Sequence, residues 1–123
     1  THTMNQQQRV QAFHDKAQEE YFISKLKSCL SYFVNKYKIQ QANLYRKVMR
    51  CETKSEEIRI YNLNKDELKS NHDDIQKKIN KLVKLLDHHH GVIEKQDREL
   101  RTIINTFRAV NMYLKRLILS FKN

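Results

Sequence analysis

The chain has 123 residues, with no proline and a single glycine, Gly91. Because turns and hairpins depend on these two residue types, the chain has few places to reverse direction, which indicates one elongated all-α domain over residues 1–123. The charged fraction of 31% excludes a thick globular core, and the formal charge of +10 favours anionic partners.

The first predicted element is a helix over residues 5–51, and residues 1–3, which precede Met4, resemble the remnant of an expression tag. From residue 21 onward, apolar side chains recur at steps of three and four, as expected for one face of a helix. This stripe comprises Ile23, Leu26, Leu30, Phe33, Tyr37, Gln40 and Leu44. Phe22, Val34, Tyr45 and Val48 widen it, and a face of this width favours burial against two or more neighbouring helices.

The same helix has a strongly basic character, because no acidic residue lies between residues 21 and 51. Lys25, Lys36 and Lys47 recur every eleven residues, close to three helical turns, so they share a face at intervals of about 16 Å. A ridge of this kind suits phosphates or an acidic partner. The candidate residues for an anionic partner are Lys25, Lys27, Lys36, Lys38, Arg46, Lys47 and Arg50.

A reversal is predicted over residues 52–64, where the apolar periodicity is least regular. Thr53 and Glu56 have the spacing of a capping box, and Asn64 and Glu67 have a similar spacing. The alternative is a helix that continues straight through this stretch.

The last predicted element is a heptad helix over residues 65–121. Its apolar positions alternate by four and three residues, which is the a/d pattern of helices that pack along one another. The predicted helix-interface residues are Ile79, Leu82, Leu86, His89, Ile93, Gln96, Leu100, Ile103, Phe107, Val110, Leu114 and Leu117. One flank of this heptad pattern changes from acidic to basic at its midpoint, which favours antiparallel pairing.

The predicted fold is therefore a long antiparallel helical hairpin or coiled-coil bundle. Because one hairpin supplies only two helices, its completion by oligomerisation is expected, with other protein helices as partners. Gly91 could instead end a helix after His88, and a break over residues 88–91 would give a three-helix bundle. The continuous helix is preferred, because Leu86, His89 and Ile93 keep the heptad phase across the glycine.

No pattern in the sequence indicates catalysis, a cofactor or a metal. Neighbouring residues on a helix point about 100° apart, so the consecutive His88, His89 and His90 cannot converge on one ion. His89 and Gln96 are instead predicted to set helix register, and His89 to make association depend on pH.

Cys29 and Cys51 form no disulfide framework, and no segment resembles a signal peptide or contains 18 uninterrupted apolar residues. These features favour an intracellular location, in the cytoplasm or nucleus. The long heptad pattern resembles coiled-coil scaffold and tethering proteins in general. The predicted function is a non-enzymatic helical coiled-coil assembly or protein–protein interaction module, as a fragment of a larger scaffold or complex subunit. The alternatives are a basic helical nucleic-acid-binding protein and a helical domain that binds or tethers anionic membrane surfaces.

Overall fold

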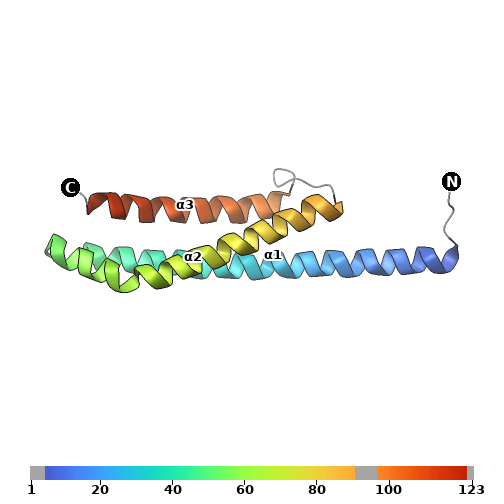
Figure 1. Ribbon diagram of the computed structural model, residues 1–123, viewed down its shortest axis with the longest axis horizontal. Coiled ribbons are helices and arrows are strands. Elements are labelled where there is room, and N and C mark those ends of the chain that lie inside the picture. Colours follow the sequence, from blue (N-terminus) through green and yellow to red (C-terminus); the bar gives the residue numbers. More distant parts are fainter. Residues whose placement is uncertain (1–4, 91–96, 122–123) are drawn as a thin grey trace.

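The computed structural model describes residues 5–90 and 97–121, apart from the side chains of residues 88–90. Over these ranges the fold is all-α and consists of three helices, α1 (Gln6–Met49), α2 (Lys54–His90) and α3 (Arg98–Ser120). They form an elongated bundle in which α2 runs opposite to α1 and α3 runs in the same direction as α1 (Figure 1).

The first helix begins at a reciprocal cap between Asn5 and Gln8. The Gln8 N–H donates to Asn5 Oδ1 at 2.8 Å, and the Asn5 N–H donates to Gln8 Oε1 at 3.1 Å. The helix ends at Met49, where Arg46 and Lys47 lie in the last turn and favour the negative end of the helix dipole. Its bounds lie inside the predicted range of residues 5–51.

The first reversal is shorter than the prediction over residues 52–64. The Glu56 N–H donates to Thr53 Oγ1 at 3.2 Å, so the predicted Thr53 cap is present and α2 begins directly after it, at Lys54. Ile60 and Tyr61 are half-buried against the core from helical positions. This stretch is therefore helical although its apolar periodicity is the least regular of the chain.

The prediction of one continuous heptad helix over residues 65–121 is wrong, and the alternative prediction, a three-helix bundle, describes the fold. Helix α2 ends at His90, and Asp97 has extended backbone angles, φ −94° and ψ 102°, before α3 begins at Arg98. The heptad phase continues past the break because α2 and α3 both present their apolar residues to the same core.

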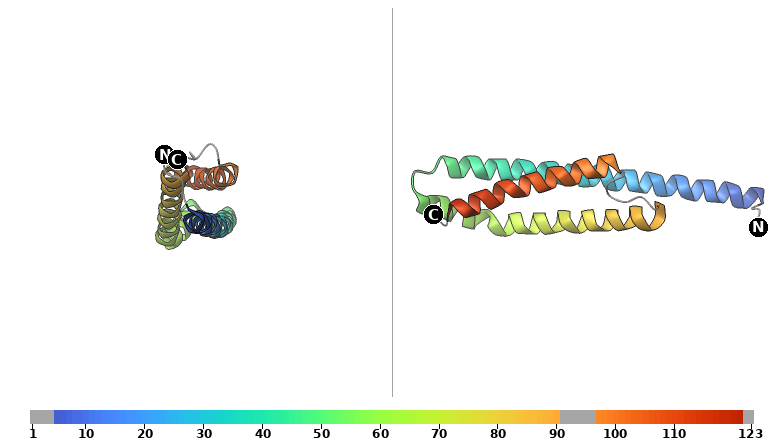
Figure 2. Two further views of the ribbon diagram at one scale, coloured as in Figure 1. Left: turned by 90° about the vertical axis from the view of Figure 1, so that its right-hand side faces the viewer. Right: turned by 90° about the horizontal axis from the view of Figure 1, so that it is seen from above.

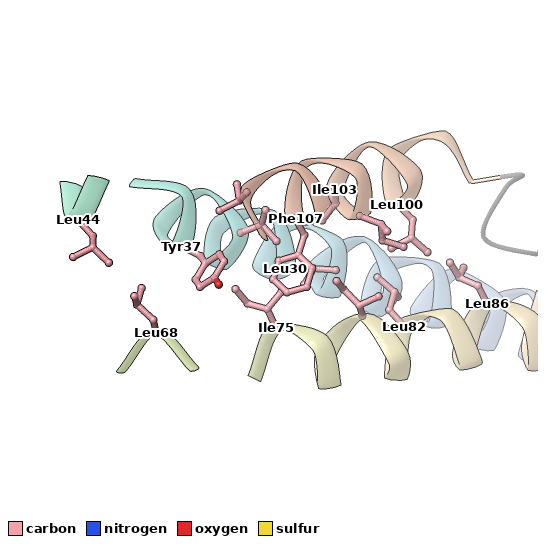
Figure 3. Close-up of a cluster of buried hydrophobic side chains, with 14 of the residues drawn as sticks. Leu30, Tyr37, Leu44, Leu68, Ile75, Leu82, Leu86, Leu100, Ile103 and Phe107 are labelled. Atoms are coloured by element: carbon pink, nitrogen blue, oxygen red, sulfur yellow. The ribbon is translucent and has the colours of Figure 1, made fainter. Parts of the chain in front are cut away.

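The core is a continuous apolar cluster that runs along the three helices (Figure 3). Its buried members are Ile23, Leu30, Val34, Tyr37, Leu44 and Val48 of α1, Leu68, Ile75, Ile79, Leu82 and Leu86 of α2, and Leu100, Ile103, Ile104, Phe107, Val110 and Leu117 of α3. Helix α1 buries Val34 and Gln41, whereas the predicted Phe33 stays 37% exposed and Gln40 is half-buried. At these two places, the buried residue of α1 is therefore the one that follows the residue of the predicted stripe.

Aromatic contacts join the three helices near the middle of the bundle. The Phe107 ring of α3 lies 5.7 Å from that of Tyr37 of α1 and 5.1 Å from that of His72 of α2, and the latter two rings lie 6.4 Å apart, centroid to centroid. The Tyr37 hydroxyl donates to Asn111 Oδ1 of α3 at 3.2 Å. These contacts fix the register of α3 against both neighbours.

The helices differ in how much of their length is covered. The N-terminal part of α1 extends beyond the ends of α2 and α3 (Figures 1 and 2). In the end-on view, α2 lies on one side of the α1–α3 pair, and no helix of the described residues lies on the other side (Figure 2). The α1–α3 pair therefore has one side packed against α2 and one side facing solvent.

Candidate interaction surfaces

Those predicted helix-interface residues that the structure describes pack against other helices of their own chain. Those buried in the core are Ile79, Leu82, Leu86, Leu100, Ile103, Phe107, Val110 and Leu117, and Leu114 is half-buried. Ile93 and Gln96 lie outside the described residues, as does the side chain of His89. Since α1 covers these positions, the chain can bury the apolar pattern without a second copy.

The structure divides the predicted basic residues into two groups. Lys27 is half-buried, and its Nζ lies 2.6 Å from Asp97 Oδ2 and 3.7 Å from Glu99 Oε2, at the start of α3. The remaining members are exposed along α1: Lys25, Lys36, Lys38, Arg46, Lys47 and Arg50. Sequence reasoning missed the role of Lys27, because its acidic partners lie far away along the chain.

Two of the exposed lysines pair with exposed aromatic rings one helical turn away. Lys25 Nζ lies 5.5 Å from the centroid of the Tyr21 ring, and Lys36 Nζ lies 5.3 Å from that of Tyr32. The two pairs recur eleven residues apart, like the lysines themselves, so the same arrangement appears twice on one face. Cation–π pairs of this kind hold the lysine heads over an aromatic surface.

Asp97 joins the start of α3 to α1. Its carboxylate accepts a hydrogen bond from the Leu100 N–H at 3.0 Å and pairs with Lys27. Burial alone would raise the pKa of the Asp97 carboxyl, but the Leu100 N–H and the Lys27 ammonium outweigh it and hold this pKa below its usual value. One side chain thus caps α3 and attaches it to α1.

We expect Asp97→Ala to lower the free energy of unfolding by about 1–2 kcal/mol at pH 7, because α3 loses its cap. Asp97→Asn should recover the cap and lose only the charge.

Because the folded-state pKa of Asp97 is depressed, its charge stabilises the fold at neutral pH, and this stabilisation is lost as the pH falls through that pKa. Urea unfolding of the wild type and Asp97→Asn should therefore converge in acid. Asp66→Ala, at an exposed site on α2, is the control, and an equal effect of both alanine variants would contradict the assignment.

Two hollows lie between α1 and α3, and we call them together the α1–α3 groove; no α2 residue lines either of them. A hollow of about 480 Å³ is lined by Lys38, Gln41, Ala42, Tyr45, Arg46, Thr106, Ala109, Val110 and Tyr113. Toward the start of α3, a second hollow of about 600 Å³ is lined by Lys27, Ser28, Ser31, Arg98, Glu99, Thr102 and Ile103. Most residues that line the two hollows are of three kinds. Some have small side chains, such as Ser28, Ala42 and Ala109, and the others are tyrosines or basic residues. Both hollows therefore lie along the same pair of helices, one nearer the start of α3 and one nearer its middle.

Gln41 is the buried polar residue of this groove. Its side chain is 7% exposed, and its Nε2 has no hydrogen-bond partner of acceptable geometry among the residues that the structure describes. Burial raises the pKa of the adjacent Tyr37 hydroxyl, and its interaction with the Gln41 side chain opposes that rise, so this amide lies beside Tyr37.

No three residues with metal-binding side chains lie together in the described ranges. None of the described helices combines the length and the apolar character needed to cross a membrane. No protein-family model, curated protein or solved structure matches the chain. Its class is defined by its own geometry, a three-helix bundle with a basic first helix and a groove along α1 and α3.

Proposed function

We propose that the chain is a non-enzymatic protein–protein interaction module that binds a helix of another protein in the α1–α3 groove. The observation that carries this proposal is the contrast between a closed core and a groove whose aromatic residues stay exposed. Tyr45 is 47% exposed and Tyr113 is 60% exposed, on either side of the same hollow. Exposed tyrosines around a concave surface are typical of residues that become buried in a protein complex.

The residues between the two tyrosines suit a helix as the occupant. Ala42 and Ala109 face the hollow from α1 and α3, and their short side chains let another helix approach closely. A fourth helix along the pair would convert the three-helix bundle into a four-helix bundle. This arrangement supports helix docking over binding of a small molecule, because the hollows are shallow and follow the helices.

The test is to fill the groove and measure helix binding. A displayed library of amphipathic helices of about 20 residues matches the length of the groove and can be selected on the immobilised chain. The double variant Ala42→Gln/Ala109→Gln adds uncharged bulk, and Ala17→Gln is the matched control at an exposed site elsewhere on α1. Selected helices should bind the wild type and Ala17→Gln equally and bind the double variant about tenfold more weakly. If no selected helix distinguishes the double variant from the control, the proposed groove is wrong.

The exposed basic face of α1 supports a second candidate function, binding of nucleic acid. Lys25, Lys36 and Lys47 lie along one face with no acidic residue in that part of α1. Lysines in such a row can neutralise phosphates, and the release of counterions then makes binding strongly dependent on salt.

For this candidate, the logarithm of affinity for random duplex DNA or RNA should fall steeply with the logarithm of salt concentration. Lys25→Gln/Lys36→Gln/Lys47→Gln should reduce the slope by about 3, whereas Lys65→Gln/Lys69→Gln/Lys77→Gln on α2 should leave it nearly unchanged. Equal effects of the two triple variants would exclude a specific role for the α1 face. Binding to anionic vesicles alone would indicate a membrane surface as the partner.

A further inference from the structure

The charges beside the groove indicate what kind of helix it would bind, an inference that rests on the proposed function. Lys38 and Arg46 are exposed and line the hollow of about 480 Å³, and none of the residues that line it is acidic. In the second hollow, Lys27 Nζ lies 2.6 Å from Asp97 Oδ2 and 3.7 Å from Glu99 Oε2, and Arg98 adds a second positive charge, so these four residues carry no net charge. The groove therefore presents a net positive edge to any occupant.

We propose that the occupant is an acidic amphipathic helix from another protein, with carboxylates placed against Lys38 and Arg46. The two cations lie eight residues apart on α1, which corresponds to about 12 Å along the helix axis. Acidic residues seven or eight positions apart on the occupant have the same spacing and lie on one face. Its small or apolar residues would then contact Ala42, Ala109 and Tyr113.

A second copy of the chain fits the groove less well than an acidic helix. The chain carries a formal charge of +10, and the α1 surface beside the groove is basic. Two copies docked through this face would bring Lys38 and Arg46 near other cations, and like charges in an interface oppose association. Charge complementarity thus selects a partner of opposite sign.

The experiment uses the same helix library, with its flanking positions randomised among Glu, Gln and Lys. It is selected on the full chain and on Lys38→Glu/Arg46→Glu, in which the groove charge is reversed. The wild type should enrich glutamate flanks and the reversed variant lysine flanks. A synthetic glutamate-flanked helix should bind the reversed variant about tenfold more weakly. Lys65→Glu/Lys69→Glu, at exposed sites on α2, is the matched control and should retain the glutamate preference.

The possible results separate this inference from the proposed function. Helices that lose binding in Ala42→Gln/Ala109→Gln but show no charge preference would overturn the acidic partner and leave helix docking intact. If the groove variants affect no selected helix, both proposals are wrong. A dimer in sedimentation equilibrium that Ala42→Gln/Ala109→Gln dissociates would assign the groove to a second copy of the chain and also overturn the acidic partner.

Discussion

Leu100→Asp is expected to destabilise the bundle by about 4 kcal/mol or more, a large fraction of the stability of a small domain. Leu100 is 0% exposed and lies in the first turns of α3, where the helix packs against the core. A carboxylate at this position would be buried in an apolar environment without a partner. Urea unfolding followed by circular dichroism at 222 nm would measure the loss.

The control for this variant is Met112→Asp, on the same helix. Met112 is 55% exposed, so a charge there stays in water, and we expect a loss below about 1 kcal/mol. Because the partners of Leu100 belong to the same chain, the unfolding midpoint of the wild type should not change with protein concentration. A midpoint that rises with concentration would show that association between chains stabilises the fold, contrary to a bundle that closes by itself.

Phe107→Ala should have the second large effect, a loss of about 3–5 kcal/mol in the free energy of unfolding. The ring is 2% exposed, and its removal would leave a cavity beside Tyr37 of α1 and His72 of α2. The neighbouring helices can fill only part of such a cavity, so the lost contacts are not recovered. Chemical denaturation would measure the loss in the free energy of unfolding, and hydrogen exchange would show which helix unfolds first.

Tyr113→Ala is the matched aromatic control for Phe107→Ala. Its ring is 60% exposed on the same helix, so its removal should change the stability of the unbound chain by less than about 1 kcal/mol. Tyr113 also lines the α1–α3 groove, and the same variant should weaken binding of a docked helix. Similar stability losses for the two variants would mean that α3 does not pack as the structure shows.

Much of the fold could be predicted from residue types and their spacing. The lack of proline and the single glycine exclude frequent reversals, which leaves helices as the main structure. The spacing of Leu82, Leu86 and Leu100 identified residues that are buried in the structure. Each of these predictions depends on local chemistry, namely backbone freedom and the period of the helix.

The predicted contacts were less accurate than the predicted elements. The heptad pattern runs from α2 into α3 without interruption, so it did not reveal that these are two helices. Such a pattern indicates which residues pack against a neighbouring helix, but it does not identify that helix. Similarly, the basic residues of α1 look equivalent in the sequence, yet Lys27 pairs with Asp97 and the others are exposed.

By itself, the sequence determined that the chain is helical, which side chains are apolar at helical spacing, and that its first helix is basic. Only the tertiary structure decided that α3 folds back along α1, that Gln41 is buried, and that α1 and α3 form a groove. The physical reason is that helical periodicity is encoded within a few residues. The choice of a neighbouring helix depends instead on contacts between residues far apart in the chain, such as Tyr37 with Phe107.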